Sequence, residues 1–234
     1  MVNMRGFKRK MKDLELKSKL LSEIPGVAHG FGTLRQEIPL SFQARWESLR
    51  PKWKQVHGVS FSEIISSSQE CGEIDAIFTV QPGHPIGIVT ADCVPILFAK
   101  KDGKGVAAVH AGWRGTYAHI TRHLWTHLIE KKGQKPSEWV AAIGPCIREC
   151  CYEVSFDLME NFKNEFPFYF PLTRNLDLVK LNETELQKIG IHEIEVLPQC
   201  TLCSKNEESN DFLFHSYRRA PSQGRQYSLI EMMI

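Results

Sequence analysis

The hydrophobic positions of the chain gather in short runs rather than in one long segment. Runs rich in Val, Ile and Ala are typical of buried strands, and turn segments such as Gln81-Pro-Gly-His84 separate them. Lys101-Asp-Gly-Lys104 is expected to form a hairpin turn between two strands. The pattern predicts strands at residues 27–32, 76–80, 86–90, 95–99, 105–109, 139–143, 193–197, 212–215 and 227–231.

Other segments carry the spacing of amphipathic helices. Between residues 116 and 132, Ile120, Leu124 and Leu128 recur at every fourth position, and Gly133 can end the helix. Since strands dominate the middle of the chain and helices are scattered between them, the sequence predicts a mixed α/β (α+β) fold. The other helices are expected at residues 42–49, 155–166 and 176–189.

No repeat or low-complexity linker divides the 234 residues, so we expect residues 13–234 to form a single domain. Residues 1–12 are basic and no apolar segment follows them, which indicates a flexible, solvated arm rather than a signal peptide. The formal net charge of +2 gives no electrostatic basis for nucleic-acid binding. The apolar runs are too short to span a bilayer. The sequence therefore predicts no nucleic-acid partner and no membrane partner.

The chain has seven cysteines, an odd number, and no visible export signal. This usage favours reduced thiols and a cytoplasmic location. Cys200 and Cys203 form a CxxC pair that can join Cys146, Cys150 or Cys151 in a structural four-cysteine zinc site. The alternative is that these thiols are free and bind no metal, and the spacing leaves both interpretations open.

Three junctions between strands and loops carry side chains that can hold a metal. His57 stands in one of them, Cys93 interrupts an apolar region in the second, and His110 ends a strand in the third. Polar residues at the ends of buried strands are costly unless they are paired or ligated. Imidazole, thiolate and imidazole form a ligand set that zinc accepts. Three protein ligands would leave a fourth position open for water or substrate, which is typical of a catalytic zinc site.

Spacing alone supports this site weakly. The gaps between the three residues are 36 and 17 positions, and no compact ligand motif is present. Histidines that are simply packed or exposed are the alternative interpretation. If the metal site forms, Asp92 is expected to orient a ligand or to transfer a proton.

Longer stretches of the chain match a known family. They are QVHG (55–58), DAIFTVQPGHPIGIVTADCVPILF (75–98), GVAAVHAGWRGT (105–116), AAIGPCI with CYEV (141–154), and SYRR with GRQYSLI (216–230). With these stretches the chain resembles the laccase-domain proteins, first labelled polyphenol oxidases and since described as zinc-dependent purine nucleoside phosphorylases. The resemblance implies a layered α/β/β/α arrangement with mixed sheets. It also implies that His57, Cys93 and His110 are the zinc ligands.

The resemblance further implies a small-molecule reaction. Adenosine, inosine or methylthioadenosine would react with phosphate to give the free base and a ribose 1-phosphate, and deamination of adenosine belongs to the same repertoire. The departing purine needs a proton, which Asp92 or a water at the metal can provide. The phosphate needs cationic or N–H donors. Arg114 is the first candidate for this role, and the other substrate-binding candidates are Gln55, Arg148, Arg35 and Arg218.

One segment departs from the family pattern. The family often carries HGFSTRxGG near its start, and its arginine helps to form the site. In this chain Leu34 stands where that arginine is expected, and Gln36 and Glu37 replace the two glycines. Arg35 is the candidate replacement, one position later. We therefore expect the metal ligands to be intact and the choice of substrate to be altered.

Three other functions fit parts of the sequence. Cys93 and His110 can act without metal as the nucleophile and base of a cysteine hydrolase. The family resemblance links such an activity to the editing of peptidoglycan precursors. A copper phenol oxidase is the older label of the family, but the chain lacks a His-Cys-His run, so zinc is expected rather than copper. The altered segment also leaves a non-catalytic binding protein open. The chain is expected to be a monomer or a weak homodimer.

Overall fold

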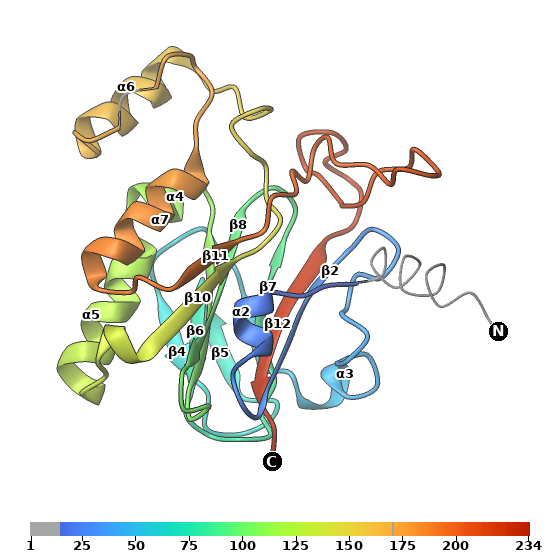
Figure 1. The fold of residues 1–234 in the computed structure, drawn as a ribbon, viewed down its shortest axis with the longest axis vertical. Helices are drawn as coiled ribbons and strands as arrows, with labels where there is room; N and C mark the ends of the chain where they lie inside the picture. The colour runs from blue at the N-terminus through green and yellow to red at the C-terminus, as the bar shows by residue number, and fades with distance from the viewer. Residues whose placement is uncertain (1–14, 170) are drawn as a thin grey trace.

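A computed structural model describes residues 15–169 and 171–234, so the expected arm at 1–12 lies outside the described residues. The larger of its two main sheets has six strands (Figure 1). The pairs at its two edges are parallel and the inner pairs are antiparallel. In spatial order the strands are β11 (Ile194–Val196), β10 (Trp139–Ile143), β8 (Val94–Lys100), β9 (Val106–Ala111), β6 (Ala76–Thr79) and β4 (Phe61–Glu63).

The second sheet is antiparallel and has four strands. Its strand β12 comes from the carboxyl-terminal end of the chain and lies between two strands from the first half. Short β3 (Lys52–Lys54) and β5 (Glu70–Glu73) form a separate parallel pair. The order of the four strands is β1 (Glu15–Leu16), β2 (Val27–Gly32), β12 (Gln226–Met232) and β7 (Ile86–Thr90).

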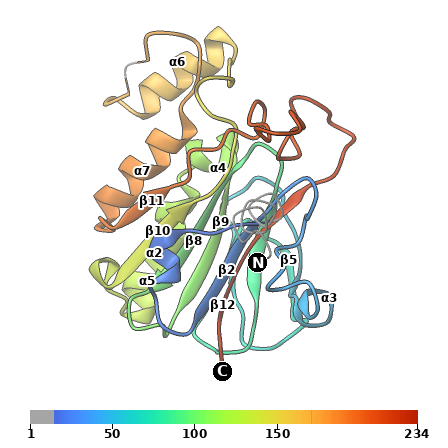
Figure 2. The ribbon, with the colours of Figure 1, turned by 45° about the vertical axis from the view of Figure 1, so that its right-hand side comes forward.

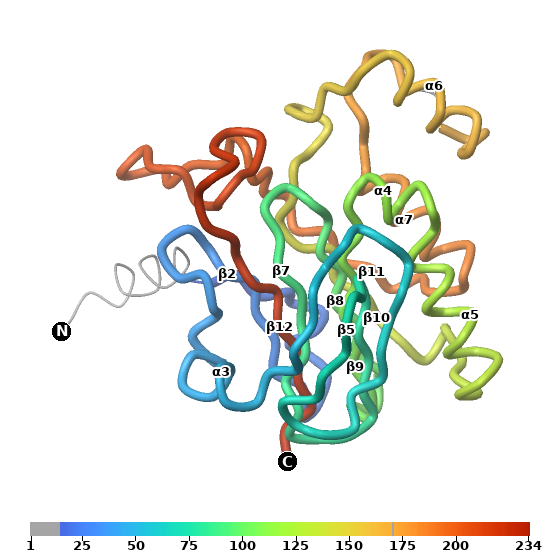
Figure 3. The backbone as a smooth tube through the Cα atoms, turned by 180° about the vertical axis from the view of Figure 1, so that it is seen from behind, coloured from blue at the N-terminus to red at the C-terminus, as the bar shows by residue number. Residues whose placement is uncertain are grey.

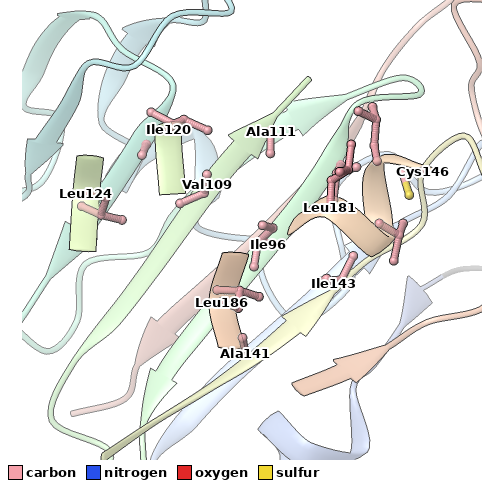
Figure 4. Close-up of a cluster of buried hydrophobic side chains, with 14 of the residues drawn as sticks. Ile96, Val109, Ala111, Ile120, Leu124, Ala141, Ile143, Cys146, Leu181 and Leu186 are labelled. Carbon is pink, nitrogen blue, oxygen red and sulfur yellow. The ribbon is translucent and has the colours of Figure 1, made fainter. Parts of the chain in front are cut away.

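The central strands are buried on both faces, which explains why their sequences are continuously apolar. In β8, Ile96 and Phe98 face the helices, whereas Leu97 and Ala99 face the four-stranded sheet. Figure 4 shows the cluster on the helical side, where Ile96 lies with residues of the neighbouring strands and of the covering helices. The two sheets therefore share one apolar layer, and a second apolar layer lies between the larger sheet and its helices.

Helices cover the outer face of the six-stranded sheet (Figure 2). They are α5 (Ile120–Lys132) and α7 (Leu178–Ile189), with α6 (Phe156–Glu165) beyond them. The short helix α3 (Trp46–Leu49) lies on the opposite side of the molecule (Figure 3). Its Trp46 packs with Phe42 against Leu229 of β12. The layered α/β/β/α fold is confirmed, although its fourth layer is a single short helix. The remaining short helices are α2 (Lys19–Ser22), α4 (Trp113–Tyr117) and the 3-10 turn η1 (Pro136–Glu138).

The helix expected at 116–132 is divided into α4 and α5, so that prediction was wrong at its start. His119 separates them in the left-handed conformation, with φ at 57°. Its two ring nitrogens contact the carboxylates of Glu165 and Glu185, at 2.8 and 3.2 Å. These contacts to α6 and α7 hold a backbone conformation that the side-chain spacing does not reveal. Gly133 ends α5 with a positive φ, as expected.

The strand expected at 212–215 does not form; within it, Phe212 makes only an isolated bridge with Lys205. The backbone of this segment forms hydrogen bonds with side chains instead of with a neighbouring strand. Gln226 accepts from the N–H of His215 at 2.9 Å and donates to its carbonyl at 3.3 Å. Arg219 donates to the carbonyl of Phe214. In the part of the chain that the structure describes, no helix has the length and apolar character needed to cross a membrane.

Candidate active site and metal centre

All three junctions singled out by the sequence open into one cavity of about 670 Å³. The cavity combines the metal-ligand candidates with cationic and aromatic side chains. It is lined by Arg50, Trp53, Gln55, His57, Val89, Thr90, Ala91, Asp92, Cys93, His110, Trp113, Arg114, Ile147, Tyr152, Leu178, Tyr217, Arg218 and Arg225.

His57 enters the cavity from the loop that follows β3. Its φ of 62° is unusual for a residue with a side chain, and one buried carboxylate holds the loop in this shape. Asp75 accepts the backbone N–H groups of Val56 at 3.2 Å, His57 at 2.9 Å and Gly58 at 2.7 Å. The loop is therefore fixed before any metal binds.

Cys93 lies in the turn between β7 and β8, and the sheet brings it beside His110. The strands β8 and β9 pair so that Val94 lies opposite Ala111. A Cβ atom added to Gly112 would lie 2.8 Å from the Cys93 Sγ and 3.1 Å from the His57 Cδ2. Only glycine at this position lets the backbone approach the two side chains so closely.

His110 is buried at the end of β9 and its ring is oriented by the same carboxylate that holds the His57 loop. The Nδ1 atom lies 2.8 Å from Asp75 Oδ1, and the backbone N–H of His110 also donates to the Asp75 carbonyl at 2.8 Å. Because an ionised carboxylate only accepts, Nδ1 donates its proton to Asp75, and Nε2 is the ring nitrogen that would ligate a metal once it has lost its own proton. Asp75 is only 1% exposed, so this hydrogen bond is shielded from water.

The ligand atoms of His57, Cys93 and His110 lie within 4.8 Å of one another. The two imidazole rings stand edge to face with 4.8 Å between their centres. Two nitrogens and one sulfur that converge from three loops, with the tautomer of His110 fixed, match the donor set of a transition-metal site. The residues present therefore fit a metal ion, which they would hold at the wall of the cavity.

The charges around Cys93 favour the thiolate. Burial alone would raise the pKa of Cys93, but the charge and hydrogen bonds of His110, together with those of His57, outweigh it and lower the pKa to about 6. Burial would lower the pKa of His110, but Cys93 and Asp75 raise it to about 9. Burial also opposes ionisation of Asp75, yet the hydrogen bonds from His110 and Gly58 keep the pKa of its carboxyl below the usual value. The sulfur is thus held in the form that ligates a metal or attacks a substrate.

Asp92 lines the cavity next to Cys93, but its carboxylate oxygens are already engaged. Oδ1 accepts from the Thr201 hydroxyl at 2.6 Å, and Oδ2 accepts from the Ser216 hydroxyl at 3.0 Å and the Arg218 N–H at 2.7 Å. The residue also has a φ of 91°. The carboxylate that bonds the candidate ligand His110 is thus Asp75, whereas Asp92 joins the Cys93 turn to two later loops.

The five substrate-binding candidates from the sequence lie in different surroundings. Arg114 lines the cavity with its guanidinium 4.2 Å from the Trp113 ring. Arg218 also lines it and lies 5.3 Å from the ring of Tyr152. Gln55 is on the wall, but its amide accepts from the Val89 N–H and donates to its carbonyl, both at 2.7 Å.

The other two arginine candidates do not line the cavity. Arg148 donates to the Leu197 carbonyl at 3.1 Å. Arg35 forms an exposed ion pair with Asp211 at 2.8 Å. The structure thus brings Arg114 and Arg218 to the metal-ligand cluster and leaves Arg35 and Arg148 outside the cavity.

Several cavity residues were missed by the sequence reasoning. Arg50 and Arg225 add guanidinium groups, and Trp53 adds an aromatic face. Asp75 and Arg225 stand inside two of the matched stretches, DAIFTV and GRQYSLI, so the matches contained a signal that spacing did not. Arg50 has no such signal, because the chain fold alone brings it to the wall.

Comparison with known proteins places the chain in a family. The family model described as multi-copper polyphenol oxidoreductase laccase matches residues 35–233. The chain belongs to this family. The purine nucleoside phosphorylase YfiH of Shigella flexneri is 32% identical over 188 residues, which cover 77% of this chain and 73% of that protein. The purine nucleoside phosphorylase CA_C1699 of Clostridium acetobutylicum is 32% identical over 76% of this chain and 74% of its own.

Solved structures agree on the fold. The crystal structure of YlmD from Geobacillus stearothermophilus has a TM-score of 0.76 at 24% identity, and the match covers 91% of this chain and 94% of that one. The crystal structure of a YfiH protein from Bacillus licheniformis has a TM-score of 0.74 at 23% identity, covering 88% and 92% of the two chains. At these identities the likeness supports the architecture of the family rather than an activity.

Proposed function

We propose that this protein is a zinc-dependent purine nucleoside phosphorylase. The observation that carries the proposal is the convergence of His57, Cys93 and His110 on a cavity that also presents Arg114 and Trp113. The names of its relatives support the same activity. The cluster would hold the metal, while the cavity has the volume and side chains to receive a nucleoside and an anion.

His57, Cys93 and His110 would hold the zinc, which when bound supplies Lewis-acid chemistry next to the reacting sugar and base. Asp75 serves this function indirectly, because it fixes the His57 loop and the His110 tautomer. The protein thereby presents its three ligand atoms without rearrangement of the backbone.

The reaction moves a glycosyl group to phosphate. A phosphate oxygen forms a bond to C1′ of the ribose, the bond from C1′ to the purine nitrogen breaks, and that nitrogen takes up a proton. Arg114 is our first candidate to bind the phosphate, because its guanidinium lies on the cavity wall against Trp113. Arg218, Arg50 and Arg225 can add positive charge around the same anion.

Aromatic side chains can hold the purine. Trp113, Tyr152 and Trp53 line the same cavity as the arginines, and flat rings of this kind stack favourably on a base. Asp92 remains our candidate to move the proton to the base. Its three bonded donors hold it in place beside Cys93.

The test is to supply metal-loaded protein with phosphate and, in turn, adenosine, inosine and methylthioadenosine. We expect release of the free base together with ribose 1-phosphate, both measured by chromatography, and no release without phosphate. Formation of inosine from adenosine in the same assay would show the deaminase activity. Elemental analysis of the purified protein identifies the metal, and stoichiometric copper with phenol turnover would overturn the zinc proposal. No product from any nucleoside would favour a non-catalytic binding protein.

A second candidate is favoured by one specific observation. Asp75, His110 and Cys93 form a chain of contacts like that of a cysteine hydrolase, in which the carboxylate orients the imidazole and the imidazole stabilises the thiolate. Such an enzyme would act without metal, for example on amide bonds of peptidoglycan precursors. Turnover that survives complete chelation would support it, whereas phosphorolysis that disappears on chelation and returns with zinc would exclude it as the main activity.

The cysteine chemistry also bears on where the protein acts. All seven cysteines are free in the structure, and we infer a cytoplasmic protein from this and from the sequence. Its expected state of monomer or weak homodimer stays a prediction, which light scattering at several protein concentrations would test.

A further inference from the structure

Four sulfur atoms outside the cavity lie close together on two loops. They belong to Cys150 and Cys151, which precede α6, and to Cys200 and Cys203, which follow β11. Their Sγ atoms all lie within 4.8 Å of one another, with 3.6 Å from Cys150 to Cys151 and 3.8 Å from Cys150 to Cys203. No disulfide joins them. Cys146, which the sequence also allowed in such a group, is instead buried in the helical core (Figure 4).

These distances suit a single tetrahedral metal ion. A zinc–sulfur bond of about 2.3 Å places the four sulfurs of a tetrahedron about 3.8 Å apart. The Sγ separations of 3.6 and 3.8 Å are close to that value and too long for an S–S bond. The backbone explains how adjacent cysteines reach one ion, because the N–H groups of Cys151 and Tyr152 both donate to the Arg148 carbonyl. This tight turn directs both thiols toward the CxxC loop.

The two loops are joined by hydrogen bonds that hold the sulfurs in place. The Thr201 N–H donates to the Cys146 carbonyl at 2.9 Å, and the Cys200 N–H donates to the Ser204 hydroxyl at 2.9 Å. The Arg148 N–H points at the Cys200 Sγ at 3.5 Å. A backbone N–H aimed at a sulfur stabilises a thiolate, which is the form that binds metal.

Positive charge is built into the same loops. Four thiolates and one divalent cation carry a net charge of −2, which needs compensation near the surface. The Arg219 guanidinium donates to the carbonyls of Thr201 and Leu202, at 3.2 and 2.8 Å, inside the CxxC loop. Arg148 lies at the other loop and donates its side chain to Leu197. Both guanidinium groups are bonded to backbone carbonyls of these loops, which holds their positive charge near the four sulfurs.

We propose that Cys150, Cys151, Cys200 and Cys203 bind a second divalent metal ion of zinc chemistry, separate from the His57–Cys93–His110 centre. Four protein ligands leave no open position, so this site is structural rather than catalytic. The ion would connect the two loops that support one wall of the cavity. Tyr152 follows Cys151 and lines the cavity, and Thr201 follows Cys200 and bonds Asp92.

The test is a metal count on the full chain, purified with a thiol reductant and dialysed against a weak chelator. We expect about two zinc ions per chain for the wild type by elemental analysis. The double variant C150S/C203S should keep about one, and H57A/H110A should also keep about one. C71S is the matched control, because Cys71 is a half-buried cysteine outside both clusters, and it should keep two.

The two double variants separate this proposal from the proposed function. If C150S/C203S fails to fold, the wild type and H57A/H110A decide the question by themselves. The proposal is overturned if the wild type holds one ion and H57A/H110A holds none. It is also overturned if C150S/C203S holds as many ions as the wild type. A disulfide among the four cysteines in freshly purified protein, found by alkylation and mass spectrometry, also overturns it.

Cobalt supplies a readout that does not depend on activity. Cobalt(II) loaded into H57A/H110A should give the intense visible bands of tetrahedral coordination and a near-ultraviolet thiolate-to-metal band. Both should be lost when C150S and C203S are added to that variant. Weak bands typical of an octahedral, oxygen-bound ion would contradict the four-thiolate site.

Discussion

Replacing Asp75 by asparagine would show how far the proposed metal centre depends on one buried carboxylate. Asp75 accepts four hydrogen bonds, from His110 Nδ1 and from the N–H groups of Val56, His57 and Gly58. An asparagine has only one oxygen to offer. If that oxygen faces His110, the amide NH₂ meets the N–H of Gly58, and if the amide is turned, the NH₂ faces His110 and favours the wrong tautomer. Neither orientation preserves the arrangement.

The size of the effect follows from these contacts. Changing the hydrogen-bond partner of a ligand histidine weakens metal binding by about 10- to 100-fold, which corresponds to about 1.4–2.7 kcal/mol. Losing a buried hydrogen bond to a charged group costs about 1.5–3 kcal/mol of stability. We therefore expect Asp75→Asn to raise the zinc Kd of the His57–Cys93–His110 centre by one to two orders of magnitude and to lower the Tm of the metal-free protein.

Competition with a chromophoric chelator at neutral pH measures the Kd, and calorimetry of the metal-free protein measures the Tm. To isolate one metal centre, the substitution is made in the C150S/C203S background. The control is Asp102→Asn, since Asp102 is exposed in the hairpin turn and accepts the Lys104 N–H at 3.0 Å, at the opposite end of β8 and β9 from Cys93 and His110. A folded Asp75→Asn protein with a zinc Kd within about twofold of its parent would refute the assigned role of Asp75.

Three further predictions test other parts of the structure. Gly112→Ala places a Cβ 2.8 Å from the Cys93 Sγ, so zinc affinity should fall at least about tenfold in the same chelator assay; unchanged affinity would show that the loop can shift freely. Arg114→Ala should raise the KM for phosphate by about tenfold or more, and unchanged phosphate kinetics would remove Arg114 from the site. Burial, with a smaller effect of Lys17, lowers the pKa of His29 to about 4, so the unfolded state binds the extra proton between pH 6.5 and 4 and stability falls as pH falls. Urea unfolding at pH 7 and pH 5 should show a loss of about 2 kcal/mol from this histidine; the loss should be absent in His29→Gln, and an equal loss in both proteins would contradict the assignment.

The buried strands could be predicted from the sequence because their surroundings are uniform. Expected strands at 27–32, 86–90 and 139–143 coincide with β2, β7 and β10, whose apolar runs are explained by burial between layers. The strands β3 and β5 could not be predicted in this way. They are short, and exposed lysine and glutamate side chains occupy most of their positions, so neither strand contains an apolar run that would mark it.

The metal-ligand candidates could be predicted for a similar reason, whereas their carboxylate partner could not. Cys93 and His110 stand where apolar strands end, and a polar residue there is conspicuous. His57 follows the exposed strand β3 and was marked instead by the matched stretch QVHG. Asp75 is also next to a strand, but its importance comes from the pairing of β6 with β9, which sets Ala76 opposite Val109. That register brings Asp75 to His110 across 35 positions of sequence, a relation that no local pattern contains. Asp92 was chosen from the sequence because it precedes Cys93 directly. The donors that occupy its carboxylate belong to distant loops, so the sequence did not reveal them either.

The altered amino-terminal segment bears less on the cavity than its sequence suggests. Leu34 stands where the family pattern has an arginine, and Arg35 is turned away to Asp211. Glu37 is likewise occupied, with its carboxylate 2.9 Å from the His215 ring. The cavity nevertheless retains positive charge from four arginines on other segments, among the residues that the structure describes. Because these groups come from Arg50, Arg114, Arg218 and Arg225, we expect the proposed phosphate binding not to depend on the segment that departs from the family. The departure of this segment from the family pattern should alter the fit of the proposed nucleoside more than the requirement for phosphate.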